Sequence, residues 1–188
     1  MSKHRHFIIH KPIGYLSQFV FNQSKRRNKK LLGELYDFPE GIMAIGRLDK
    51  NSEGLLLLTT DGKVSEAIRS KKVEKEYYVE LDGEITNEAI EQLKVGVEIS
   101  LKKEKYHTLP CQARRLFPAP IFESAKPTKT RHRPSSWLSI TLTEGKFRQV
   151  RKMTAQVGFP TLRLIRVRIG SVTLGKLSAG EVVEVEDF

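Results

Sequence analysis

The sequence has only one cysteine, Cys111, in 188 residues. A lone cysteine cannot form an internal disulfide, and without a second cysteine it cannot help to build a thiolate metal site. Long apolar runs are missing as well, because no stretch approaches the roughly 18 apolar residues of a membrane span. The first residues also lack the apolar segment of a signal peptide. We therefore expect a reduced, cytoplasmic setting and no membrane contact.

Acidic residues are scarce relative to basic ones. The chain has 33 Lys and Arg against 22 Asp and Glu, which gives a net charge of +11 and a pI of about 9.8. Such an excess predicts a polyanionic partner such as nucleic acid. The length is sufficient for one substantial core, which can be built as two lobes, and is too short for two ordinary domains.

Patterns typical of metal sites are also missing. His4, His6 and His10 form a loose group near the N-terminus, which we interpret as a basic arm. Glu53 and Asp61 are near Asp49 in the sequence, but their spacing matches no recognised ligand pattern. Neither a metal enzyme nor a metal-dependent nuclease is therefore expected.

Strand and helix patterns alternate along the chain without a regular repeat. Strands are predicted at residues 6–12, 41–49, 54–60, 75–81, 164–170 and 181–185. A further strand is predicted from Ser135 up to a turn at Glu144 and Gly145. Helices are predicted at residues 31–38, 61–70, 86–96 and 147–157, with Asp61 and Thr86 as N-terminal caps and Gly96 as a C-terminal stop. The four consecutive leucines Leu55 to Leu58 indicate a strand covered on both faces. Because regular crossover helices are missing, we expect a mixed α/β fold with a largely antiparallel central sheet flanked by helices.

Two segments concentrate positive charge. The stretch "NQSKRRNKK" is predicted to be an exposed loop, and "KPTKTRHRP" a flexible connection with nothing apolar to bury. Their basic residues are candidates for contacts with phosphate groups: Lys25, Arg26, Arg27, Lys29, Lys30, Lys129, Arg131 and Arg133.

The segment "GRLDKNSEGLLLLTTDG" contains the most unusual polar residues. It places Arg47 and Asp49 in a turn-rich stretch directly before a strongly apolar run. Charged groups at the edge of a buried strand cost desolvation energy. The pair is therefore either structural or part of a reactive site. A carboxylate can act there as a nucleophile, a general base or a metal ligand.

An ionised Asp49 in a partly buried site calls for a neighbouring cation. Arg47 is one candidate, but in an extended turn its side chain can point away from that of a residue two places along, so Arg151 is the better candidate. On a helix from Phe147 to Val157, the residues Phe147, Val150, Met153, Thr154 and Val157 form the buried arc, and Arg151 lies on its border. An arginine at such a border usually has an acidic partner. The spacing leaves open whether that partner is Asp49 or another carboxylate.

Two adjacent tyrosines, Tyr77 and Tyr78, lie on one predicted strand and must face opposite sides of the sheet. At most one of them can face a given site. Geometry alone does not say which one, and aromatic residues on strands more often belong to a core.

Several motifs resemble a known enzyme family. "GRLDKNSEGLLLLTTDG", "KEYYV", and "EGKFRQVRKM" followed by "VGFPTLRLIRVRIG" resemble, in that order, the three motif regions of the RsuA-type ribosomal RNA pseudouridine synthases. "HKPIGYLSQF" is similar to the opening strand and turn of that family. The resemblance covers nearly the whole chain. "PSSWL", "RQVRKMTA" and "VGFPTLRLIR" match the RluE type, which modifies large-subunit ribosomal RNA.

The resemblance implies that the chain isomerises a uridine of ribosomal RNA, most closely 23S RNA, without a metal or organic cofactor. Asp49 is implied as the nucleophile, with attack at the uracil ring or at ribose C1′. Arg47 is implied to help hold the flipped-out arrangement of the RNA. Tyr77 is implied to stack on the uracil and to assist proton removal, which leaves Tyr78 as a packing residue.

The third motif implies that Arg151 pairs with Asp49 and that Val150 lines the uracil pocket. It also carries Arg148 where many relatives have histidine, and Arg148 is counted among the RNA-binding residues. Many relatives carry a small S4-type domain before the catalytic one. This chain reaches its opening strand by Phe7, so either the catalytic domain alone grips the RNA or a preceding segment has been trimmed. Residues 1–188 are expected to form the catalytic domain, as two lobes around an RNA-binding cleft, and to act as a monomer.

A second function, from another class, fits the same charge and loops. A non-catalytic RNA-binding or ribosome-assembly protein could share this fold and retain RNA without changing it. The intact set of Asp49, Tyr77 and Arg151 favours the enzyme, because binding alone does not require a carboxylate beside phosphate groups.

Overall fold

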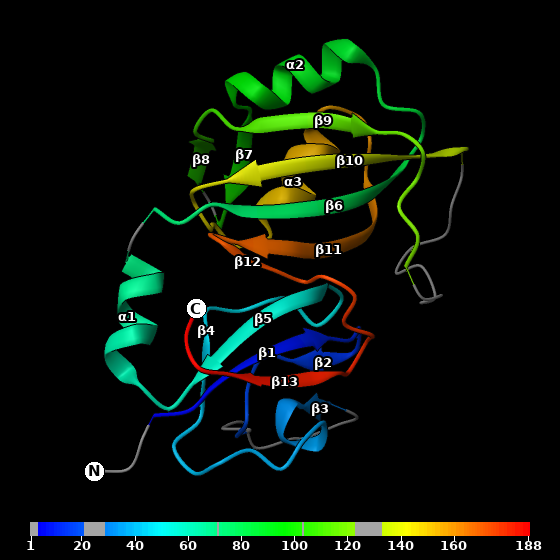
Figure 1. Cartoon of the computed structure of the whole chain (residues 1–188). Helices are drawn as coiled ribbons and strands as arrows, with labels where there is room; N and C mark the ends of the chain where they lie inside the picture. Colours follow the sequence, from blue (N-terminus) through cyan, green and yellow to red (C-terminus); the bar gives the residue numbers. More distant parts are fainter. Residues whose placement is uncertain (1–3, 21–28, 71, 103, 123–132) are drawn as a thin grey trace. The chain divides into compact units, whose positions relative to one another are not determined.

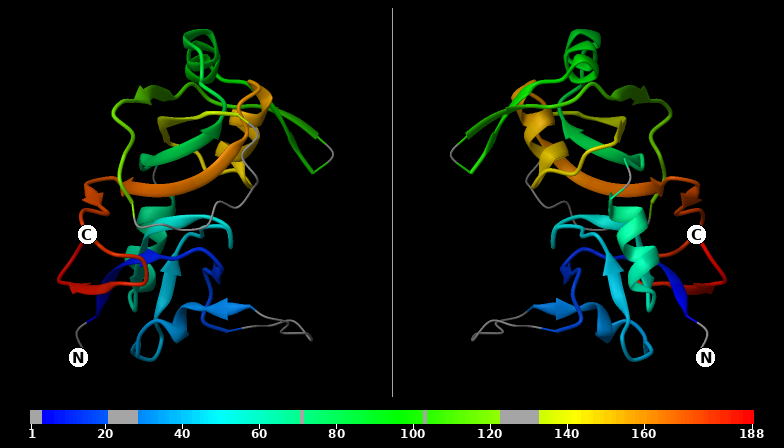
Figure 2. Two further views of the ribbon diagram at one scale, coloured as in Figure 1. Left: turned by 90° about the vertical axis from the view of Figure 1, so that its right-hand side faces the viewer. Right: turned by 90° about the vertical axis from the view of Figure 1, so that its left-hand side faces the viewer.

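The computed structural model describes residues 4–20, 29–70, 72–102, 104–122 and 133–188. The chain forms two compact units (Figures 1 and 2). The first unit comprises Met1–Val73 and Arg166–Phe188, and the second comprises Glu74–Ile165. The fold is mixed α/β with mostly antiparallel strand pairs, as the sequence predicts.

Strands of the first unit pair with β1 (His6–Lys11) and with the fully buried β5 (Glu53–Thr59). In their sheet β1 lies between β13 (Val182–Val185) and β5, and both pairs are antiparallel. The strand β4 (Met43–Ile45) also pairs with β5. Leu55 to Leu58 are at most 1% exposed, which confirms that this strand is covered on both faces.

The first unit also contains the last residues of β11 (Thr161–Ile169), from Arg166 onward, which lie beside β5 in the strand order. The short strand β12 (Val172–Thr173) pairs with β11. Gly54 is needed at the start of β5 because its φ is +105° and a Cβ there would collide with the backbone of Arg166. Only glycine satisfies both conditions at low cost.

A smaller element replaces the helix predicted at residues 31–38. The structure has a parallel pair of β2 (Tyr15–Leu16) and β3 (Lys30–Leu31), followed by a single 3₁₀ turn, η1 (Leu32–Glu34). The prediction of a helix there was wrong. Pro39 disfavours helical backbone at Phe38, and the Phe38 ring packs 5.5 Å from the Phe7 ring and 5.3 Å from the Phe19 ring.

The second unit contains the remaining strands of the nine-stranded sheet and a core of its own. Its strand order is β11, β6 (Lys75–Asp82), β10 (Ser135–Leu142) and β9 (Gln112–Leu116), with antiparallel pairing of β10 to both of its neighbours. Two helices, α2 (Asn87–Val95) and α3 (Gln149–Gln156), contribute to the core. The buried residues include Val79, Leu81, Ile90, Leu93, Leu138, Ile140, Val150 and Met153.

The predicted ends of α2 are confirmed. Thr86 accepts a hydrogen bond from the Ala89 N–H at 3.2 Å, and Gly96 ends the helix with φ +100°. A hairpin of β7 (Glu98–Leu101) and β8 (Glu104–His107) follows, which the sequence did not predict. Both strands are short and mostly exposed, so they lack a clear apolar alternation.

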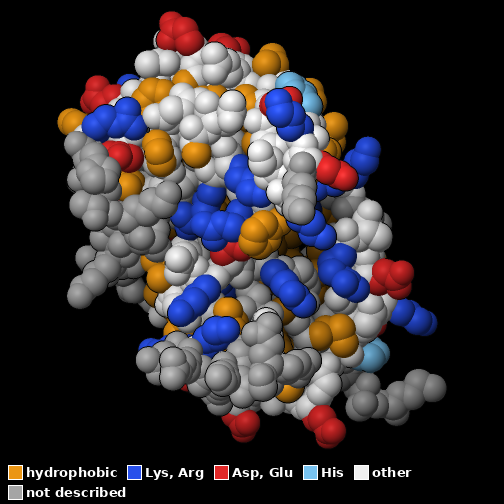
Figure 3. Space-filling view, turned by 180° about the vertical axis from the view of Figure 1, so that it is seen from behind, with side chains coloured by type: hydrophobic (Ala, Val, Ile, Leu, Met, Phe, Trp, Pro, Cys, Tyr) orange, Lys and Arg blue, Asp and Glu red, His pale blue; other side chains and the backbone are white. Residues whose placement is uncertain are grey.

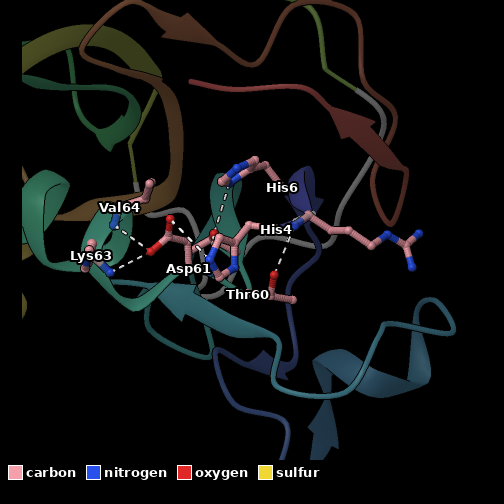
Figure 4. Close-up of polar contacts among 8 residues, drawn as sticks. His4, His6, Thr60, Asp61, Lys63 and Val64 are labelled. Atoms are coloured by element: carbon pink, nitrogen blue, oxygen red, sulfur yellow. Dashed lines mark hydrogen bonds and ion pairs between the residues drawn. The ribbon is translucent and has the colours of Figure 1, made fainter. Parts of the chain in front are cut away.

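Asp61 closes the N-terminus of α1 (Gly62–Ser70), as predicted (Figure 4). Its Oδ1 accepts hydrogen bonds from the N–H of Lys63 at 2.8 Å and of Val64 at 3.4 Å. His4 Nε2 lies 3.8 Å from Asp61 Oδ2. The hydrogen bond from Lys63 is the main reason why the pKa of Asp61 is lowered.

We expect the charge of Asp61 to stabilise the fold only above its titration range. Because the folded pKa is lowered from an ordinary value of about 4, this contribution is present above that value and disappears as the pH falls through the folded pKa. Asp61→Asn should therefore lower the urea midpoint at pH 7 and approach the wild type below about pH 4. Asp37→Asn, at an exposed residue outside any helix, is the control. A constant difference across this range would contradict the prediction.

Candidate active site

The turn that carries Asp49 joins β4 to β5 in the first unit. Arg47 is exposed, Leu48 is buried, and Asp49 is half-buried. Within the turn, the Ser52 N–H donates to the Asp49 carbonyl at 3.0 Å. The side chain of Leu48 thus anchors the turn in the interior while Arg47 extends toward solvent. This arrangement presents a carboxylate at the border of the apolar core.

A second segment, residues 12–17, forms hydrogen bonds to the backbone of the same turn. The Ser17 hydroxyl donates to the Leu48 carbonyl and accepts from the Leu48 N–H, both at 2.9 Å. The Gly14 N–H donates to the Lys50 carbonyl at 2.8 Å. Gly14 has φ +94°, a conformation that glycine adopts without strain. The backbone on both sides of Asp49 is therefore fixed by hydrogen bonds.

Lys11 is a fully buried lysine at the end of β1, opposite Gly54 on β5. Its Nζ donates to the carbonyls of Pro12 at 2.9 Å and Tyr15 at 2.8 Å. Burial lowers the pKa of Lys11 to about 7, while the charges of Glu53 and Asp49 oppose this shift. Sequence reasoning missed this residue, although "HKPIGYLSQF" contains it.

Further charged groups are buried around Lys11. Glu53 is 2% exposed, and its Oε1 lies 3.9 Å from His10 Nε2. Arg166 Nε donates to the Leu55 carbonyl at 2.8 Å, and the charge of Arg166 lowers the pKa of Lys11 further. Asp49 therefore belongs to a group of opposite charges at the start of β5.

The other predicted site residues lie in the second unit. Tyr77 on β6 packs against the core that contains Val150, and Arg151 on α3 is buried, with 8% exposure. Tyr78, predicted as a packing residue, has its ring 6.3 Å from the Phe122 ring. Val150 and Arg151 are consecutive buried residues of α3, and their side chains point about 100° apart around the helix axis.

One part of the helical prediction was wrong. Phe147 is 71% exposed and does not belong to the buried arc. The helix begins only at Gln149, because Arg148 has a left-handed backbone with φ +53° that interrupts a helical path. Phe147 instead lies before the helix, with the Lys152 Nζ 5.4 Å from its ring centre.

Glu144 fixes the start of α3, a role that the sequence did not indicate. Its carboxylate accepts hydrogen bonds from Tyr106 Oη and Gln149 Nε2, each at 2.5 Å, and from the Leu109 N–H at 2.8 Å. Gln149 Oε1 in turn accepts from the Lys146 N–H at 2.9 Å. These bonds link the β10–α3 turn to the β7–β8 hairpin and the segment that follows it.

The predicted RNA-binding residues differ in their surroundings. Arg133 donates through Nη2 to the carbonyls of Asp82 and Gly158, and its guanidinium lies 5.6 Å from the Phe159 ring centre. Lys30 Nζ lies 5.4 Å from the Tyr15 ring centre. Figure 3 shows further basic side chains on the surface. The structure also describes Lys29 and Arg148, whereas Lys25, Arg26, Arg27, Lys129 and Arg131 lie outside the described residues.

The predicted catalytic residues are divided between the units. Arg47 and Asp49 belong to the first unit, and Tyr77, Val150 and Arg151 belong to the second. Within the second unit, Tyr77 packs against the core that contains Val150. The pair of Asp49 and Arg151 would join the two units, and it stays a prediction.

The described residues contain no group of three or more His, Cys, Asp or Glu side chains placed to hold a metal ion. No helix in the described part of the chain is long and apolar enough to cross a membrane.

The chain matches known proteins over most of its length. The family model for RNA pseudouridylate synthase matches residues 5–156. The chain belongs to this family. A ribosomal large subunit pseudouridine synthase E from Vibrio parahaemolyticus is 38% identical over 182 residues, which covers 95% of this chain and 73% of the relative. The enzyme of the same name from Xanthomonas axonopodis is 40% identical over 175 residues, with 91% and 88% coverage. The resemblance to the RluE type is thereby confirmed.

A solved structure supports the same assignment for this pseudouridine synthase. A crystal structure of a pseudouridylate synthase has a TM-score of 0.76 and 26% identity, and the match covers 98% of this chain and 71% of that one. The human RNA pseudouridylate synthase domain containing 1 has a TM-score of 0.54 at 13% identity, which shows a shared fold.

We expect the buried Lys11 to make the stability of the synthase rise with pH above 7. Between about pH 7 and the unfolded value near 10.4, the unfolded chain holds a proton that folded Lys11 has lost. The free energy of unfolding should therefore gain about 1 kcal/mol per pH unit from this residue. A neutral amine still has two N–H groups for its two carbonyl partners.

Urea unfolding at pH 7 to 10 checks this prediction by comparing the wild type with Lys11→Met and with Lys50→Met, an exposed lysine in the Asp49 turn. Of the three proteins, only Lys11→Met should lack the rise in the free energy of unfolding with pH. Titration of the Lys11 side chain by NMR provides a second measurement that does not depend on the variant folding. A lysine still protonated at pH 9 would contradict the prediction.

Proposed function

We propose that the chain converts a specific uridine of large-subunit ribosomal RNA to pseudouridine, with Asp49 as the nucleophile. The observation that carries this proposal is the carboxylate itself. Asp49 is half-buried beside an apolar strand, in a turn whose backbone is hydrogen-bonded at Leu48, Asp49 and Lys50. The relatives named as large-subunit pseudouridine synthases support the choice of RNA.

The reaction is an isomerisation. Asp49 attacks either the uracil ring or ribose C1′, and the bond between C1′ and N1 breaks. The uracil then turns, C5 bonds to C1′, and the Asp49 carboxylate is expelled from the carbon that it attacked. Finally the C5 proton leaves and N1 takes up a proton. Atoms and electrons balance without a cosubstrate, and water must be excluded because it would hydrolyse the intermediate.

The other residues are proposed to prepare the base and the nucleophile. A base within an RNA helix must be flipped out, which costs a few kcal/mol of stacking energy. Arg47 would help to hold the flipped arrangement, Tyr77 would stack on the uracil, and Val150 would line its pocket. Arg151 would pair with Asp49 and keep it ionised.

The surroundings of the site are proposed to bind RNA through its backbone. The basic segments would contact phosphate groups without reading sequence. The two units would form lobes around an RNA-binding cleft in a monomeric, cytoplasmic enzyme. The alternative function, a non-catalytic RNA-binding or ribosome-assembly protein, would retain the same RNA unchanged.

Tritium release from ribosomal RNA labelled at uracil C5 tests the proposal. The wild type should release tritium, and Asp49→Asn should lower the rate by more than about a thousandfold because the nucleophile is removed. Asp187→Asn, at an exposed aspartate, is the matched control and should react normally. RNA binding is measured in parallel.

The outcomes separate the two functions. Loss of release with retained binding in Asp49→Asn supports an enzyme that acts through this carboxylate. If the wild type releases no tritium from large-subunit RNA, small-subunit RNA or partly assembled particles, the binding protein becomes the better explanation. Shortened RNA would indicate a nuclease.

We also expect the first basic segment to contribute phosphate contacts. Replacing Arg26 and Arg27 together with alanine should weaken RNA binding and flatten the slope of log K against log salt concentration by about 1.5. The chemistry of bound RNA should be unchanged. The double variant Lys63→Ala, Lys72→Ala removes the same charge outside that segment and is the control. An equal slope in the wild type and the arginine variant would exclude these contacts.

A further inference from the structure

A single serine hydroxyl holds both polar groups of the residue that precedes Asp49. Ser17 Oγ donates to the Leu48 carbonyl and accepts from the Leu48 N–H. A hydroxyl can do both at once because it is a donor and an acceptor. Ser17 and Leu48 are each 7% exposed, so water cannot easily replace either bond. The two residues are 31 positions apart in the sequence.

The serine belongs to a segment that is itself firmly held. Lys11 Nζ donates to the carbonyls of Pro12 and Tyr15, which fixes the chain before Ser17. Lys11 is the last residue of β1 and pairs with Gly54 on β5. The serine is therefore anchored to the same sheet that supports the Asp49 turn.

Two further backbone hydrogen bonds hold the turn at and after Asp49. The Gly14 N–H fixes the Lys50 carbonyl, and the Ser52 N–H fixes the Asp49 carbonyl. Both bonds act on or after Asp49 in the chain. Ser17 supplies the hydrogen bonds on the preceding side, so its loss frees the peptide from which the Asp49 side chain projects.

We propose that Ser17 is a positioning residue of the isomerisation, which acts by fixing the Leu48 backbone and thereby the direction of the Asp49 carboxylate. The proposal rests on the proposed role of Asp49 as the nucleophile. A nucleophile must be held close to its productive geometry, and a misplacement of about 1 Å can lower a rate by about a hundredfold. Ser17 itself touches no reacting atom.

The matched comparison is Ser17→Ala against Ser65→Ala. Ser65 is another buried serine of the first unit, on α1 and outside the Asp49 turn. With saturating RNA, Ser17→Ala should lower the single-turnover rate of tritium release about tenfold to a hundredfold, with an unchanged dissociation constant for RNA. Ser65→Ala should react at the wild-type rate. Ser17→Thr, which keeps a hydroxyl, should recover most of the rate.

NMR follows the geometry of the Asp49 turn directly, without an assay of activity. The ¹³Cγ signal of Asp49 should shift or broaden in Ser17→Ala, and the Leu48 amide should exchange faster with solvent because its acceptor is gone. Both signals should be unchanged in Ser65→Ala. Urea unfolding of the two alanine variants separates these effects from a general loss of stability.

The results distinguish the failure of this proposal from that of the proposed function. A wild-type rate in Ser17→Ala, or an unchanged Asp49 signal, would overturn the positioning role while leaving the isomerisation intact. If the wild type itself releases no tritium, the proposed function fails and the positioning role in the reaction fails with it. An Asp49 signal that still moved would then show only that Ser17 holds the turn.

Discussion

The burial of β5 on both faces is the constraint on which the Asp49 turn depends. Leu55 to Leu58 are at most 1% exposed, and buried polar groups beside such a strand are stabilised by hydrogen-bond partners. Arg166 Nε serves the Leu55 carbonyl, and the close backbone of Arg166 requires glycine at position 54. A strand that is buried along its whole length thus supports a turn that carries a charge.

The charges near this strand form a set whose members offset one another. An unpaired ion in an apolar interior is far more costly than one with an opposite neighbour. The negative charges of Glu53 and Asp49 raise the pKa of Lys11, whereas the positive charge of Arg166 lowers it. His10 lies beside Glu53. For this reason, replacing any other charged residue of this group alters the electrostatic environment of the Asp49 carboxylate as well as the local packing.

The sequence contains enough local information for most of the fold. Leu55 to Leu58 indicated a buried strand, and Asp61 and Thr86 marked helix starts because capping depends on neighbours within three residues. The prediction at Phe147 failed because helical periodicity does not reveal where a helix begins. There, the left-handed backbone of Arg148 decided the outcome.

Only some residues of the candidate site could be predicted from local sequence patterns. Asp49 was found because a charge beside four leucines is unusual, whereas Ser17 and Lys11 gave no local signal. Their partners are distant residues or backbone carbonyls that any sequence would offer. The hairpin of β7 and β8 was missed because too few of its residues are buried.

The bonds between residues 12–17 and the Asp49 turn also have a consequence for how the turn forms. The turn is held by residues distant in sequence, because Ser17 and Gly14, which follow β1, bond to Leu48 and Lys50, which precede β5. Closing such a long loop has an entropic cost that must be met before the contacts form. A peptide cut from residues 46–62 would therefore lack these bonds, because the position of Asp49 depends on contacts distant in sequence.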